Sequence, residues 1–217
     1  FQREEYIENA WVKNDIIQPV RYQFNAAPLT DQGKSYNYLI GGLGYKILNE
    51  KEVSVTGLGA ALNVVQIPST VAINDKTYKV TTIDQSAFSA DKEITDVIFG
   101  NNVTTIEKQA FYQCPNLRTI RFGTKVTKIG SNAFAECAKL KNFTLPASVK
   151  RIDTKAFYQC PAVKTVKINS TALEYVGKKG LAVNKTVTMK LPKKLFTKYQ
   201  KMIKASSVYP KTKFIKS

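Results

Sequence analysis

The stretch AFYQCP occurs twice, at residues 110–115 and 156–161, and a near copy, AFAEC, lies between them at residues 133–137. Alignment of the chain on the Ala-Phe pair gives four copies, whose phenylalanines are Phe88, Phe111, Phe134 and Phe157. Each copy begins 23 residues after the previous one. A motif that returns at one fixed period indicates a repeat architecture in which each copy forms one structural unit.

Further apolar columns follow the same period on both sides of the Ala-Phe pair. They are Val80, Val103, Val126 and Val149; Ile83, Ile106, Ile129 and Ile152; Ile94, Leu117, Leu140 and Val163; Val97, Ile120, Phe143 and Val166; and Phe99, Phe122, Leu145 and Ile168. So many apolar columns in register predict side chains that stack from each repeat onto the next.

The spacing within one copy predicts the local structure. Ile120 and Phe122 alternate with polar residues, as one face of a strand requires. Val103 and Ile106 predict a second short extended piece, and the Ala-Phe pair falls on a tight helical or 3₁₀ turn. One such unit cannot bury its own apolar edge, whereas a stack of identical units forms a continuous core.

The repeated pattern A-F-x-x-C-x-x-L-x-x-I-x-F/L, followed by V-x-x-I, resembles the BspA-like leucine-rich repeat of bacterial surface proteins. The match is close over residues 80–168 and weaker at 64–71 and 173–181. The resemblance implies a leucine-rich-repeat solenoid, a β-rich right-handed superhelix with short turns and a cap at each end. It also implies a secreted or surface-anchored protein that binds host or neighbouring-cell proteins or glycans without catalysis.

We expect four parts along the chain. They are an N-terminal segment of unknown role at 1–42, an N-terminal β cap at 43–79, leucine-rich repeats at 80–184 and a Lys-rich C-terminal cap at 185–217. Asn74-Asp75 lies between two extended stretches and predicts a hairpin turn in the first cap. A helix over the last repeat is predicted by the helical spacing of Leu195, Tyr199, Met202 and Ile203.

The charge is strongly positive, with 33 Lys and Arg against 16 Asp and Glu and a net charge of +17. Residues 175–217 contain twelve Lys and no acid. Such a charge attracts nucleic acid, anionic glycans and anionic membranes alike. Because no nucleic-acid-reading motif is present and the resemblance implies export, we expect a protein or anionic glycan partner and no nucleic acid.

The chain begins at Phe1 without a basic and apolar leader, so we interpret it as a processed or trimmed product. No stretch approaches the roughly 18 apolar residues of a membrane helix, and no membrane-spanning segment is predicted. The resemblance to bacterial surface proteins implies a location outside the cell or on its surface.

The sequence carries little catalytic equipment. It contains no His, which removes Ser-His-Asp and Cys-His nucleophile systems and His metal ligands. Asp91 and Glu93 are expected in a solvent-facing turn rather than as a glycosidase pair. We therefore predict no enzyme activity, no cofactor and no metal. The alternative is an accessory, non-catalytic domain of a surface polysaccharide-binding or hydrolytic system.

Cys114, Cys137 and Cys160 share one column. Rungs about 4.8 Å apart would bring neighbouring Cα atoms within disulfide range. However, stacked side chains point the same way, and free Cys is commonly buried as a small hydrophobe. We predict packed free thiols, with a metal site or a disulfide as the alternatives.

The best candidates for ligand contact are the polar residues between the inward columns, which also stack. One row holds Thr95, Arg118, Lys141 and Lys164; another holds Ile98, Arg121, Thr144, Lys167 and Lys190; a third holds Asp96, Thr119, Asn142 and Thr165. In leucine-rich repeats this sheet face is typically concave and faces the ligand. The predicted ligand-binding residues are Arg118, Arg121, Lys141, Lys164 and Lys167. The alternative is an ordinary solubilising surface.

Overall fold

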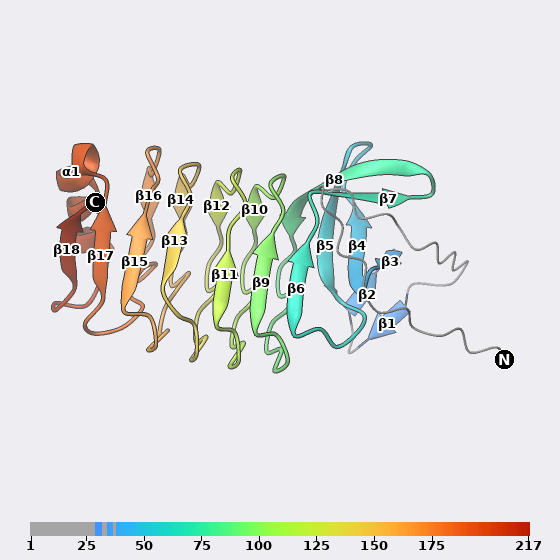
Figure 1. The fold of residues 1–217 in the computed structure, drawn as a ribbon, viewed down its shortest axis with the longest axis horizontal. Coiled ribbons are helices and arrows are strands. Elements are labelled where there is room, and N and C mark those ends of the chain that lie inside the picture. The colour runs from blue at the N-terminus through green and yellow to red at the C-terminus, as the bar shows by residue number, and fades with distance from the viewer. Residues whose placement is uncertain (1–28, 32–33, 37) are drawn as a thin grey trace.

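The computed structural model describes residues 29–31, 34–36 and 38–217. From residue 38 onward the chain winds into a solenoid whose strands stack side by side along the long axis (Figure 1). Strands β1 (Leu29–Asp31) and β2 (Lys34–Tyr36) form a small antiparallel pair at the N-terminal end. The predicted segment at 1–42 lies mostly outside the described residues, so its role stays a prediction.

One side of the solenoid is a row of short strands that we call the front sheet. Its strands are β6 (Val64–Ile67), β9 (Asp96–Phe99), β11 (Thr119–Arg121), β13 (Phe143–Leu145), β15 (Thr165–Ile168), β17 (Thr188–Leu191) and β18 (Lys213–Lys216). Neighbouring strands are parallel, and β11 lies beside β13 (Figure 1).

A second side is formed by the back sheet. Its strands are β3 (Tyr38–Ile40), β4 (Leu43–Ile47), β5 (Glu52–Leu58), β8 (Lys76–Ile83), β10 (Thr105–Ile106), β12 (Lys128–Ile129), β14 (Arg151–Ile152) and β16 (Tyr175–Val176). Strand β7 (Thr70–Ile73) pairs with β8 as a hairpin. From β10 to β14 the register joins Ile106 to Ile129 and Ile129 to Ile152, which confirms the 23-residue columns.

The third side consists of the Ala-Phe turns. Ala110 N donates to Glu107 O and Tyr112 N donates to Gln109 O, so consecutive turns close with the three-residue spacing expected. These turns also bond to the next rung, because Phe111 N donates to Ala133 O at 2.7 Å. The backbone ladder thus continues around the core, which explains why each copy keeps the same turn sequence.

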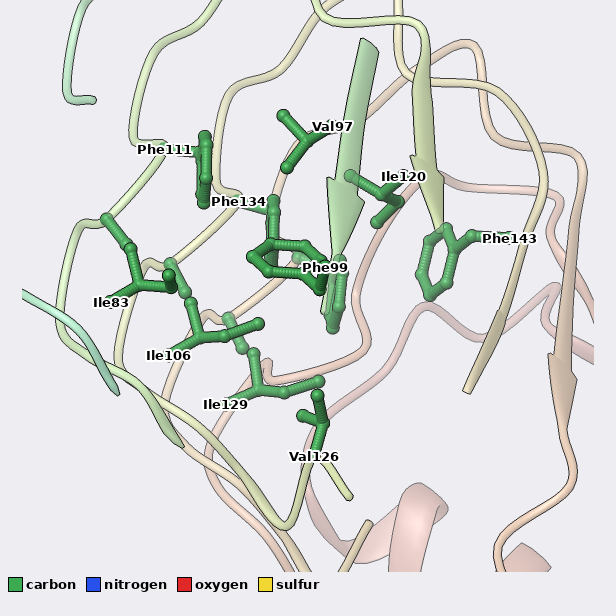
Figure 2. Packing of buried hydrophobic residues seen from close by; sticks show 14 of the residues in the cluster. Ile83, Val97, Phe99, Ile106, Phe111, Ile120, Val126, Ile129, Phe134 and Phe143 are labelled. Atoms are coloured by element: carbon green, nitrogen blue, oxygen red, sulfur yellow. The ribbon is translucent and has the colours of Figure 1, made fainter. Parts of the chain in front are cut away.

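The core lies inside these three sides. Ile83, Ile106 and Ile129 follow one another along the back-sheet side, and Phe111 and Phe134 stack beside the turns (Figure 2). Both phenylalanines are completely buried. The predicted inward columns are therefore confirmed as the hydrophobic core.

Phe122 departs from its column because it is only partly buried. Strand β11 ends at Arg121, so Phe122 lies in the following loop. Its ring stacks on that of Phe99 at 5.6 Å and meets Phe134 edge-on at 5.9 Å. The Phe122 ring therefore covers the edge of the hydrophobic core.

The structure contains the two secondary-structure elements that the sequence predicts near the ends of the repeats. Asn74 and Asp75 have φ of 49° and 62°, as the turn of a two-residue hairpin requires, and this confirms the predicted hairpin between β7 and β8. At the other end, helix α1 (Phe196–Ala205) follows a short 3₁₀ helix, Lys193–Leu195, and buries Tyr199 and Ile203. The predicted C-terminal helix is confirmed. No helix among the described residues combines the length and apolarity needed to cross a lipid bilayer.

Candidate ligand-binding face

The front sheet turns alternate side chains outward. Ile120, Phe143 and Val166 are buried, whereas Arg121 and Lys167 are exposed. This alternation is the two-residue period of a strand, and the parallel register repeats it on every rung. Strand alternation therefore places Arg121 and Lys167 in an ordered row on the surface. Arg118, Lys141 and Lys164 precede the strands and are exposed there.

The five predicted residues lie in the strands of the front sheet or within two residues before them. Lys141 N donates to Arg118 O at 2.9 Å, so these two residues stack directly on adjacent rungs. Lys164 follows on the next rung, where its carbonyl accepts a hydrogen bond from the N–H of Thr188 at 2.9 Å. The second row runs from Arg121 through Thr144 to Lys167, which pairs with Lys190. We call these two rows the basic stripe, and we use the name for Arg118, Lys141 and Lys164 together with Arg121, Lys167 and Lys190.

A single acid, Asp96, lies at the N-terminal end of the stripe. The hydrogen bond from Thr95 Oγ1, at 2.7 Å, lowers the pKa of the Asp96 carboxyl, and Thr119, Arg118 and Arg121 act in the same direction. Asp96 is thus ionised at neutral pH. Beyond it, residues 114–126, 137–150 and 160–173 supply no carboxylate to this side of the solenoid.

A shallow depression of about 420 Å³ lies where the chain enters β13. Its lining is Arg118, Ala138, Lys139, Lys141 and Ala162. The depression is open because the side chains of Ala138 and Ala162 are small. The cations of Arg118, Lys139 and Lys141 surround it. Lys139 Nζ donates to Asn116 Oδ1 at 2.7 Å, which holds the lysine beside the depression.

Lys139 was not among the predicted site residues. The predicted residues lie in the front strands or within two residues before them, whereas Lys139 lies in the preceding turn. The available signal was its column, because the adjacent copies have Asn116 and Ala162 at that place. In this column a lysine has a hydrogen-bond acceptor on the preceding rung and an alanine on the next, and that pattern could have identified Lys139.

The back sheet carries its charges differently. Lys128 Nζ lies 3.1 Å from Glu107 Oε1, and Arg151 Nε lies 2.6 Å from Asp153 Oδ1. Arg151 also stacks over the ring of Tyr175 at 4.2 Å. These two cations of the back sheet therefore have carboxylate partners, whereas no carboxylate lies within ion-pair distance of the basic stripe among the described residues.

In the acidic pair considered for hydrolysis, Asp91 has a structural role. Asp91 Oδ1 accepts hydrogen bonds from the N–H groups of Glu93 and Ile94, at 2.8 and 2.9 Å. The carboxylate thereby shapes the turn into its rung. Within the part of the chain that the structure describes, no group of three His, Cys, Asp or Glu residues lies close enough to hold a metal ion.

The three cysteines are free and buried, which confirms the predicted packed thiols. Each thiol donates to the carbonyl of a core phenylalanine on the preceding rung: Cys114 to Phe88 at 3.0 Å, and Cys137 to Phe111 at 3.2 Å. Cys160 donates to the carbonyl of Phe134 in the same way. Burial raises the pKa of the Cys160 thiol to about 12, so it stays protonated and unreactive at neutral pH.

The stacked short strands, the 23-residue register and the outward rows define a leucine-rich-repeat solenoid. A family model described as the BspA-type leucine-rich repeat region matches residues 62–208 in six copies. The match covers more than half of the chain, and the protein belongs to this family. No curated protein matches the sequence.

Solved bacterial structures share the fold. A leucine-rich repeat protein from Bacteroides capillosus is 26% identical, with a TM-score of 0.55, over 60% of this chain and 96% of its own. A second, from Bacteroides ovatus, is 25% identical with a TM-score of 0.53 over 72% of this chain and 48% of its own. A leucine-rich cell surface protein from Faecalibacterium prausnitzii is 23% identical, with a TM-score of 0.61, over 77% and 45%. The chain thus spans about half the length of the last two.

Proposed function

We propose that this protein is a secreted or surface-anchored bacterial interaction module that binds host or neighbouring-cell proteins or glycans and performs no catalysis. The observation that carries the proposal is the basic stripe, whose cations repeat in register and are exposed except for the partly buried Lys190. No carboxylate of the described residues lies within ion-pair distance of them. Charged side chains on a rigid sheet present a fixed pattern, and such a pattern favours the binding of an acidic partner. The predicted site residues are Arg118, Arg121, Lys141, Lys164 and Lys167.

Two further observations support this reading. The repeat fold is typical of interaction modules, because stacked rungs form an extended binding surface. One structural neighbour is described as a cell surface protein. Arg118 and Arg121 add a chemical preference, since a guanidinium holds a carboxylate or sulfate through two parallel hydrogen bonds.

An array of glycans and extracellular-matrix proteins tests the proposal. Wild-type protein is compared with a stripe variant and with a cap variant of equal charge loss. The stripe variant replaces Arg118, Arg121, Lys141 and Lys164 with Ser; the cap variant replaces Lys193, Lys194, Lys198 and Lys201 with Ser. We expect specific ligands that are lost with the stripe variant and kept by the cap variant. A stripe variant that retains every ligand would overturn the proposal.

A further inference from the structure

We propose that the ligand of the basic stripe is a linear acidic glycan that lies along the solenoid axis, with one anionic sugar unit on each rung. This inference rests on the proposed function and names the chemical class and orientation of its ligand. Three features support it: the spacing of the front strands, the depression beside β13 and the side chains between the cations.

The spacing of the stripe favours an axial ligand. Parallel strands lie about 4.8 Å apart, so Arg118, Lys141 and Lys164 present their charges at that interval along the axis. The second row continues the stripe to Lys190 on β17, and β18 adds Lys213 opposite Thr188. A polysaccharide whose successive rings rise by a similar distance meets one cation after another. A ligand lying across a single rung meets only one or two.

The depression gives the stripe a place where one anionic group is held from three sides. Arg118, Lys139 and Lys141 surround it, and Ala138 and Ala162 keep it open. A carboxylate or sulfate there receives the Arg118 fork and two ammonium groups. The adjacent Asp96 carboxylate repels an anion on β9, so we infer that the glycan extends from this depression toward β18.

The residues between the cations distinguish a glycan from a nucleic acid. Sites for single-stranded nucleic acid combine a basic groove with aromatic platforms on which the bases stack. The outward positions between the cations carry hydroxyl and amide groups instead: Thr119, Asn142, Thr144, Thr165 and Thr188. Such groups suit the hydroxyls of a sugar chain, and no aromatic side chain stands among them.

Titration calorimetry with size-defined oligogalacturonates tests the inference. These linear chains carry one carboxylate on each sugar and are available from two to about eight units. We expect affinity to rise with length up to about five units, one for each strand from β11 to β18 at about 4.8 Å, and then to level off. The variant R118S/K139S/K141S should bind about tenfold more weakly, because several exposed ion pairs act together. The control variant K193S/K194S/K198S, with the same charge loss, should bind within about twofold of wild type.

Each other outcome overturns the inference in a recognisable way. Affinity that levels off at two or three units places the ligand across the rungs rather than along them. Equal weakening of binding in both triple variants shows that the glycan is attracted only by the net charge of the protein. Equal affinity for a single-stranded oligonucleotide of the same charge leads to the same conclusion. If no oligogalacturonate binds while stripe-dependent ligands persist on the array, the glycan assignment fails and the proposed function stands.

Discussion

The rings of Phe111 and Phe134 lie 5.2 Å apart between centroids, with their planes only 2° from parallel. The Phe134 ring stacks in the same way on Phe157, also at 5.2 Å. These contacts join consecutive rungs through the same side chain in each copy. The Ala-Phe motif therefore repeats in the sequence because each rung must pack against the next rung with the same side chains.

Replacement of Phe134 by Ala should lower the free energy of unfolding by about 3 to 5 kcal/mol, since it removes a fully buried ring and leaves a cavity between two rungs. The transition in urea should also broaden or split, because stability in a repeat stack depends on each interface. The exposed substitution Thr144→Ala serves as the control. A loss below about 1 kcal/mol would remove Phe134 from the core and contradict the register.

The hydrogen bond from Leu173 N to Tyr199 Oη, 3.0 Å long and buried, joins the helix α1 to the last repeat. Tyr199→Phe keeps the ring and leaves the Leu173 N–H without its partner. We expect a loss of about 1 to 3 kcal/mol in urea unfolding. Tyr175→Phe, at a residue that is 41% exposed, should change stability by less than about 0.5 kcal/mol. Equal effects of the two substitutions would show that the helix does not depend on this bond.

The packed thiols predict a clear labelling pattern. Native protein should leave all three cysteines unmodified by a bulky thiol reagent, because each is buried and bonded to a carbonyl. Denatured protein should react at all three. The intact mass should equal that of the fully reduced chain, and a mass lower by about two hydrogens would reveal a disulfide instead.

Burial of Cys160 also predicts a loss of stability at alkaline pH. Its pKa is about 12 in the folded protein, whereas a thiol in an unfolded chain ionises near pH 8.5. Above pH 8.5 the unfolded state releases a proton that the folded state retains, so stability falls as pH rises, by up to about 1.4 kcal/mol per pH unit. Urea unfolding at a series of pH values should show a steeper fall for wild type than for Cys160→Ala. Parallel curves would show that Cys160 does not carry this dependence.

The fold could be predicted because its determinants repeat. Ile106 and Phe111 recur in register with their counterparts, and one period places both the strand and the turn. The rim position of Phe122 could not be predicted, because it depends on where β11 ends rather than on hydrophobicity. The pattern therefore identifies core columns better than the limits of each strand.

The candidate site was predictable only in part. Exposure of Arg121 follows from strand alternation, and the structure agrees. Arg118 lies before β11, three residues from Arg121, and its exposure does not follow from the two-residue period. Arg118 and Arg151 look alike in the sequence, yet Asp153 pairs with Arg151 and no described carboxylate pairs with Arg118. The Arg151–Asp153 pair forms within one rung, between residues two apart in the sequence, and the residue two after Arg118 is the apolar Ile120. The depression beside Lys139 depends on small residues from two different rungs, which the period does not encode.

Salt elution from a heparin column tests the central claim most directly. The stripe variant (Arg118, Arg121, Lys141 and Lys164 to Ser) and the cap variant (Lys193, Lys194, Lys198 and Lys201 to Ser) lose the same charge. Exposed ion pairs contribute only about 0 to 1 kcal/mol each and weaken with salt. Ordered rows should therefore bind heparin more tightly than scattered charges only when several cations contact the same chain. We predict that the stripe variant elutes at much lower salt than wild type, while the cap variant elutes close to wild type. Retention that survives the stripe substitutions and collapses with the cap substitutions would show that the front sheet is not the binding site.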